Sequence, residues 1–278
     1  MKIYKIEDGA LIEHKDTYYK LTDDWDHIIN RPYLHNFLKE KIADIKPNGD
    51  GLPFRDSVKP PIGNQEIWAA GVTYYRSKKA RMEESQDAGG ADFYDKVYDA
   101  ERPELFFKAM ANRTVGSRSS VYIRRDSTWN VPEPELTLFI NSEGSIQGYT
   151  IGNDMSSRII EGENPLYLPQ AKVYEKCAGL GPCIYVPKEP IATDTLIEIE
   201  ILRGTTTIFQ GEVAIDQMKR KHTELVEFLF RECEFPFGCF LMTGTGIVPP
   251  DDFTLEVGDE VRIAISNIGT LINYIDTK

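Results

Sequence analysis

One short stretch governs how this chain must fold, Val131-Pro132-Glu133-Pro134-Glu135-Leu136. Pro132 and Pro134 fix their own φ angles, and Pro134 also pushes Glu133 toward extended backbone, which argues against a helix. Side chains two residues apart on an extended chain point to the same face, so Glu133 and Glu135 lie on one side. In a chain this acidic, the simplest interpretation of such a pair is a solvated loop.

Asp154 indicates that the two glutamates belong to a shared site rather than to a solvated loop. It follows Glu135 by 19 residues, and the sequence between them predicts a β-hairpin, with strands at 137–140 and 146–150 and a turn at 142–144. A strand that leaves and a strand that returns bring Asp154 back toward Glu135. Three carboxylates make an all-oxygen site, which suits Mg²⁺, Mn²⁺ or Ca²⁺ better than Zn²⁺.

Five short motifs occur in order along the chain: Pro-Glu-Pro-Glu-Leu at 132–136, Gly-Asn-Asp-Met-Ser-Ser-Arg at 152–158, Gln-Ala-Lys at 170–172, Gly-Leu-Gly-Pro at 179–182 and Thr-Gly-Thr-Gly-Ile-Val-Pro at 243–249. In this order they resemble the fumarylacetoacetate hydrolase family, and the resemblance extends from about Trp68 to the C-terminus. It implies a β-rich catalytic domain in which Glu133, Glu135 and Asp154 hold a divalent metal, usually Mg²⁺. It also implies that Lys172 stands beside a metal-bound 2-oxo acid.

One corner of the sequence departs from the hydrolytic members of that family. Those members carry an Asn-Tyr-x-x-His-x-x-Glu pattern whose histidine and glutamate activate the attacking water. Here Tyr74 matches the tyrosine, but Ser77 stands at the histidine position and Ala80 at the glutamate position. Because a serine without its own base does not take a proton from water near neutral pH, carbon–carbon bond hydrolysis by that route is not expected.

The sequence instead resembles a branch of the family that dehydrates 2-keto-3-deoxy sugar acids. That branch has an acid matching Glu104, which the resemblance implies acts with Lys172 in catalysis. A lysine near a cation and away from bulk water has its charged form disfavoured, which makes it a usable base. The alternatives without a catalytic role are a surface ion pair for Glu104 and a solvated side chain for Lys172. Substrate contacts are expected from Ser77, Lys108 and Thr245.

The expected activity is therefore Mg²⁺-dependent dehydration of a small anionic 2-oxo acid. Two other reactions remain open, hydrolysis of an acylpyruvate-type carbon–carbon bond and decarboxylation of a 2-oxo diacid. An alternative of another class is a non-catalytic protein that binds 2-oxo acids. The resemblance also implies a homodimer or homotetramer.

Composition limits the partners and the location. Lys and Arg total 32 against 44 Asp and Glu, and the net charge of −12 argues against nucleic acid and anionic membranes as partners. The four cysteines form two pairs, each spaced by six residues, which indicates reduced thiols rather than a disulfide framework. No signal peptide or apolar run of spanning length is apparent, so a cytoplasmic protein is expected.

The domain organisation is expected to be a small N-terminal α/β domain at 1–60 and a catalytic domain at 61–278. Residues 2–21 predict short strands, 33–42 predict a helix, and the turn-rich 47–53 and 60–61 mark the boundary. The fold class is α+β and β-rich, with the mixed β-sandwich or roll that the resemblance implies. The polar residues 87–100 are interpreted as an active-site lid or a surface loop.

Overall fold

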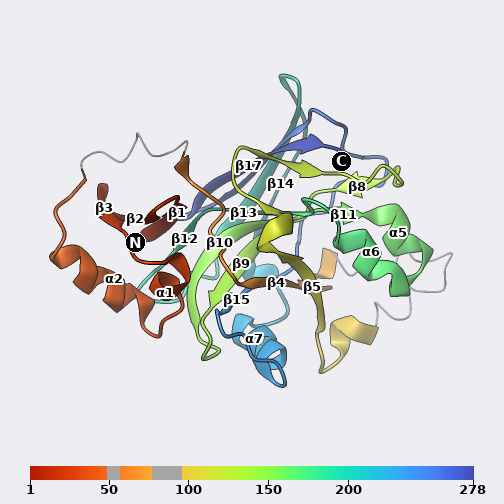
Figure 1. Cartoon of the computed structure of the whole chain (residues 1–278). Helices are drawn as coiled ribbons and strands as arrows, with labels where there is room; N and C mark the ends of the chain where they lie inside the picture. Colours follow the sequence, from red (N-terminus) through yellow and green to blue (C-terminus); the bar gives the residue numbers. More distant parts are fainter. Residues whose placement is uncertain (49–56, 77–95) are drawn as a thin grey trace.

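The computed structural model describes residues 1–48, 57–76 and 96–278 (Figure 1). These residues form a large mixed sheet, a five-stranded sheet and a two-stranded ribbon, with short helices around them. The fold is α+β and β-rich, as the sequence predicts. Most of the expected lid, 87–100, lies outside the described residues.

The large sheet consists, in spatial order, of β3 (Thr17–Leu21), β2 (Gly9–His14), β1 (Lys2–Ile6), β12 (Ala178–Tyr185), β10 (Ile146–Asp154), β9 (Pro134–Ile140), β15 (Cys239–Met242), β4 (Glu66–Gly71) and β5 (Glu104–Met110), with β6 (Thr114–Val115) beside β12. The five-stranded sheet contains β14 (Thr206–Ala214), β13 (Leu196–Arg203), β16 (Glu260–Ile265), β17 (Gly269–Asp276) and β7 (Ser119–Tyr122). The ribbon pairs β11 (Ser156–Ser157) with β8 (Asn130–Val131).

The α-helices with described bounds are α1 (Trp25–Ile29), α2 (Leu34–Ala43), α5 (Arg158–Glu163), α6 (Leu168–Lys172) and α7 (His222–Phe230). Three 3₁₀ turns are η2 (Ala111–Arg113), η3 (Pro165–Tyr167) and η4 (Ile215–Gln217). In Figure 1, α1 and α2 lie at the N-terminal end of the molecule, whereas α5 and α6 lie at the opposite end, next to β11.

Strand β9 shows how the two sheets pack. All seven of its residues are buried, and successive side chains point to opposite faces. Leu136 and Leu138 belong to the core shared with the isoleucines of β13 and β16. Phe139 belongs to a second core that includes the apolar residues of α1 and α2. Because other residues cover both faces of β9, most of its residues are apolar. Each polar residue in this strand therefore requires a specific structural or functional explanation.

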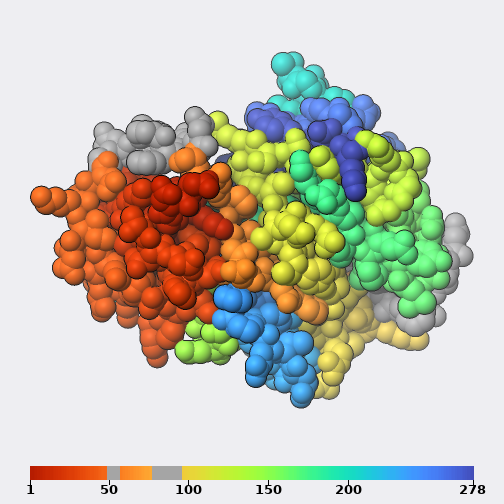
Figure 2. Space-filling model, in the orientation of Figure 1, coloured from red at the N-terminus to blue at the C-terminus, as the bar shows by residue number. Residues whose placement is uncertain are grey.

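The N-terminal strands extend the large sheet. β1 pairs with β12 in antiparallel register, with Lys2 opposite Tyr185 and Ile3 opposite Ile184. Figure 2 shows residues 1–48 as a rounded lobe against the rest of the molecule. The division into domains at 1–60 and 61–278 remains a prediction about independent folding, because hydrogen bonds of one sheet join the two parts.

One expected helix is shorter than the sequence suggests. The apolar spacing predicts a helix over 221–235, but α7 ends at Phe230. Glu232 and Glu234 follow its C-terminal end, where negative charge opposes the helix dipole. Pro236 in turn disfavours helical backbone at Phe235.

Two features bear on the cellular environment. All four cysteines are free, and only Cys233 is exposed. Among the described residues, no helix has the length and apolar character needed to cross a membrane.

The packing of β9 predicts the effect of one core substitution. Leu138→Ala should lower the free energy of unfolding by about 2–5 kcal/mol, because the surrounding sheets relax only partly around the cavity. Leu166→Ala is the matched control, since that side chain is 82% exposed and should change stability by less than about 0.5 kcal/mol. Urea unfolding followed by circular dichroism measures both, and equal stabilities would contradict the assigned core.

Candidate active site and metal centre

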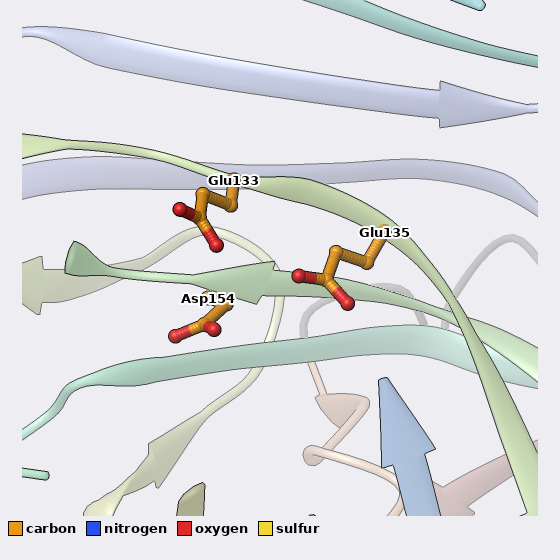
Figure 3. Close-up of side chains that lie close together, drawn as sticks. All are labelled: Glu133, Glu135 and Asp154. Carbon is orange, nitrogen blue, oxygen red and sulfur yellow. The ribbon is translucent and has the colours of Figure 1, made fainter. Parts of the chain in front are cut away.

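Three carboxylates converge at the start of β9 and the end of β10. Glu133, Glu135 and Asp154 each offer one oxygen, and these three oxygens lie within 4.8 Å of one another (Figure 3). All three residues are buried, with at most 5% of their surface exposed. We call this group the carboxylate triad. The sequence predicts this convergence, and the hairpin of β9 and β10 produces it.

The hairpin register explains the convergence. The backbone N–H of Glu133 donates to the carbonyl of Asp154 at 3.2 Å, and the N–H of Asp154 donates back to Glu133 at 3.0 Å. The two residues therefore lie directly opposite each other, with neighbouring side chains on one face. Glu135 follows on the same face, opposite Gly152, where a Cβ would lie 2.4 Å from Thr137 Oγ1.

The triad has the chemistry of a divalent cation site. Burial raises the pKa of Glu135 well above its usual value, and the charges of Asp154 and Glu133 raise it further. The N–H of Gly244 partly offsets this by donating to Glu135 Oε2. A hard divalent ion relieves the mutual repulsion of three buried carboxylates and takes oxygen ligands of this kind. The residues present thus fit Mg²⁺.

Lys172, at the end of α6, places its amine against the triad. Its side chain is fully buried, and Nζ lies 2.7 Å from Glu133 Oε2 and 3.0 Å from Asp154 Oδ2. Nζ also donates to Ser156 Oγ at 2.6 Å. The structure therefore excludes the solvated alternative for this lysine. Its predicted role as the base remains a prediction.

Lys108 approaches Asp154 from the other side. Its Nζ lies 2.5 Å from Asp154 Oδ1 and donates to the carbonyls of Met155 and Lys172. These contacts fix the end of β10 and the last residue of α6 relative to each other. Lys108 Nζ is engaged with protein groups at this position, and its predicted contact with substrate stays a prediction.

Two charged residues of α5, Arg158 and Glu161, join the triad, Lys108 and Lys172 in one cluster of charged groups. The sequence analysis did not identify either of them as a site residue. Arg158 Nη2 lies 2.8 Å from Glu133 Oε1, and Arg158 Nη1 lies 3.5 Å from Glu161 Oε2. Glu161 Oε1 in turn lies 3.4 Å from Lys172 Nζ. The available signal was Ser157, which caps α5 by accepting from the N–H of Ile160, followed by Arg158 and Glu161 at helical spacing.

The charges in this cluster nearly balance. Among the described residues, the triad and Glu161 supply four carboxylates, and Lys108, Arg158 and Lys172 supply three cations. With all seven groups ionised, the cluster carries one net negative charge, which a divalent ion changes to one positive charge. In a poorly solvated site, that remaining charge favours an anionic ligand.

Glu104 begins β5, opposite Gly71 of β4. A Cβ on Gly71 would lie 1.9 Å from Glu104 Oε2, so the carboxylate of Glu104 lies across the glycine. Phe106, two residues along the same strand face, has its ring centre 5.7 Å from Lys172 Nζ. Glu104 therefore lies on the face that is directed toward Lys172, and its predicted role there is untested.

The remaining predicted contacts differ in position. Thr245 is buried, and its hydroxyl is engaged with the backbone N–H and carbonyl of Ile247 at 3.2 Å. Burial and the charge of Glu135 raise the pKa of Tyr74, which is also buried. Ser77 lies outside the described residues. The substrate contacts expected from Thr245 and Ser77 remain predictions.

Comparisons with known proteins agree with this geometry. Residues 67–276 match the family model described as fumarylacetoacetate (FAA) hydrolase C-terminal. A probable 2-keto-3-deoxyxylonate dehydratase of Haloferax volcanii is 47% identical over 218 residues, which cover 78% of this chain and 74% of the relative. A 2-dehydro-3-deoxy-D-arabinonate dehydratase of Saccharolobus solfataricus is 44% identical over 225 residues, covering 80% and 75%.

A solved structure extends the likeness to the whole chain. It is a 2-keto-3-deoxy-D-arabinonate dehydratase complexed with magnesium and 2,5-dioxopentanoate, and it superposes with a TM-score of 0.84 at 36% identity. The superposition covers 100% of this chain and 99% of that one. With a family model that matches most of its residues and relatives above 40% identity, this chain belongs to the fumarylacetoacetate hydrolase family.

Proposed function

We propose that this protein is a Mg²⁺-dependent dehydratase that converts a 2-keto-3-deoxypentonate, such as 2-keto-3-deoxy-D-arabinonate, to 2,5-dioxopentanoate and water. The observation that carries the proposal is the buried carboxylate triad with the amine of Lys172 within 3.0 Å of two of its members. The dehydratase relatives support the substrate class. Both of their names describe a five-carbon 2-oxo acid with a methylene at carbon 3.

A divalent ion held by the triad would draw electrons from the substrate's 2-oxo group and make the carbon 3 protons more acidic. Lys172, whose amine contacts two members of the triad, is assigned the removal of one of these protons. The hydroxyl at carbon 4 is then β to the carbonyl. Its loss as water leaves a double bond between carbons 3 and 4.

Glu104 is assigned to protonate the departing hydroxyl. Its strand face also carries Phe106, whose ring centre lies 5.7 Å from Lys172 Nζ, so acid and base approach the substrate from neighbouring elements. Moving a proton from carbon 5 to carbon 3 then gives the enol of the 5-aldehyde, and Lys172, protonated in the first step, is assigned to return the carbon 3 proton. Tautomerisation of this enol, which moves its hydroxyl proton to carbon 4, gives the aldehyde of 2,5-dioxopentanoate. This series of reaction steps consumes no oxidant and releases one water.

We further propose a cytoplasmic location and a homodimer or homotetramer. The free cysteines support a reducing compartment. Sedimentation equilibrium of the purified protein tests the assembly, and a single species of monomer mass would rule it out.

A substrate panel tests the reaction directly. Incubation with Mg²⁺ and five- and six-carbon 2-keto-3-deoxy acids should give the dioxo acid from the pentonates, followed as aldehyde, and no pyruvate. Acylpyruvates and 2-oxo diacids serve as controls. Release of two carbon fragments would identify the hydrolase alternative, and release of CO₂ the decarboxylase. Ligand-induced stabilisation with no product would identify a binding protein.

Removing the amine of Lys172 tests its assignment. Lys172→Met should lower kcat by at least about 10³-fold, because the base is lost while most of the side-chain volume remains. Calorimetric titration should still detect Mg²⁺ binding, since the triad is intact. Lys188→Met, whose side chain is 79% exposed, is the matched control. Turnover near that of the control would remove Lys172 from the mechanism.

Gly71 allows Glu104 to be tested without replacing it. Gly71→Ala should lower kcat about 10- to 100-fold, because the new methyl group displaces the Glu104 carboxylate, a flexible group that can move without unfolding the strand. Glu104→Gln should lower kcat about 10²–10⁴-fold. Adding Gly71→Ala to Glu104→Gln should cause little further loss. Full additivity of the two effects would show that Gly71 does not act through Glu104.

A further inference from the structure

The charged groups of α5 and α6 form a closed ring with one member of the triad. Glu133 contacts Arg158 through Oε1 and Lys172 through Oε2, at 2.8 and 2.7 Å. Glu161 contacts the same two cations, Lys172 through Oε1 and Arg158 through Oε2, at 3.4 and 3.5 Å. Positive and negative groups alternate around the ring, and no side chain in it is more than 7% exposed.

We propose that Arg158 and Glu161 are positioning residues, Arg158 for the metal ligand Glu133 and Glu161 for the amine of Lys172. This inference rests on the proposed function, because it assigns how that site keeps its ligand and its base in place. We call these four residues the charge ring.

Arg158 determines which oxygen of Glu133 is offered to the cation. Its guanidinium takes Oε1, while Oε2 lies beside Lys172, whose Nζ also contacts Asp154 Oδ2 at 3.0 Å. Oε2 is therefore on the Asp154 side of the carboxylate. Without the Arg158 contact, the Glu133 carboxylate loses one of the cations that hold it, and the rotational freedom it gains must be lost again on metal binding. Arg158 reduces that conformational cost because its planar guanidinium group contacts Glu133 and Glu161 at the same time.

Glu161 matters most when the cation is bound. Two of the carboxylates that contact Lys172 belong to the triad, and their negative charge is shared with the cation once it binds. The cation also repels the lysine in its ammonium form. Glu161 lies outside the triad, so its attraction for Lys172 persists. With Ser156 Oγ, it keeps Nζ beside the ligand that the cation holds.

A purely structural role for the two residues makes a different prediction. If the ring only stabilises the packing of α5 against α6, any variant that preserves folding should turn over substrate and bind the cation like the wild type. If the residues position the site, Glu161 should affect turnover, and Arg158 should affect the affinity for the cation before any substrate is present.

Glu161→Gln tests the first part. Its kcat should fall about 10- to 100-fold, with KM and Mg²⁺ affinity within about threefold of the wild type. Glu163→Gln is the matched control, because that glutamate lies on the same helix and is exposed. If the glutamine variant does not fold, Glu161→Asp keeps the charge but withdraws the carboxylate from Lys172, and the same fall is expected. A kcat equal to that of the control would overturn the assignment.

Arg158→Lys tests the positioning of Glu133 by Arg158, because lysine keeps the positive charge but lacks the planar guanidinium group. The affinity of the substrate-free protein for Mn²⁺, followed by electron paramagnetic resonance, should weaken about 10- to 100-fold. Arg231→Lys, a partly exposed arginine paired with Glu227 on α7, is the matched control. Unchanged affinity would refute the role of Arg158. This measurement needs no turnover, so it stands apart from a failure of the proposed reaction.

Discussion

The pair of backbone hydrogen bonds between Glu133 and Asp154 is the constraint on which the site depends. These bonds set the register at the open end of the β9–β10 hairpin, and in a strand a slip of one residue turns every side chain to the opposite face. Such a slip would send Glu133 and Glu135 into the apolar core that Leu136 and Leu138 share with the five-stranded sheet. The same apolar alternation that packs the two sheets therefore holds the carboxylates together. Stability and metal binding are specified by a single pattern.

Burial strengthens the electrostatic interactions within the site, and it is also the main energetic cost of forming the site. Carboxylates and ammonium groups removed from water lose several kcal/mol of hydration each, which their mutual attraction recovers only with good geometry. Here the lysines approach Asp154 from two sides, and Arg158 and Lys172 share the two oxygens of Glu133. The remaining negative charge is concentrated at the triad, where the pKa of Glu135 is raised. A divalent cation is the missing counter-charge for an arrangement that protein groups alone leave unbalanced.

The sequence predicted the parts of the site that follow from local periodicity. The alternation of 137–140 and 146–150 around a turn was sufficient to predict that Asp154 returns toward Glu135, and the structure confirms the hairpin. Arg158 and Glu161 were missed because a pair spaced three apart on a short polar helix usually lies on a surface. Their burial depends on how α5 packs against α6 and β8, which is tertiary information. Lys108 shows the same limit, since a register irregularity in β5 at this point breaks the simple alternation of faces.

The amine of Lys172 and the triad are held in place by different elements of the fold. The amine is held from behind by α5 and from the side by Ser156, and neither element belongs to the strands that carry the triad. The triad and Lys172 are therefore supported by separate parts of the chain that meet at Glu133. Glu104 lies on β5, a strand that carries no member of the triad. Dehydration then requires an acid at carbon 4, whereas hydrolysis requires a base for water. In the proposed mechanism Glu104 is that acid, and it lies on a strand separate from those that carry the triad.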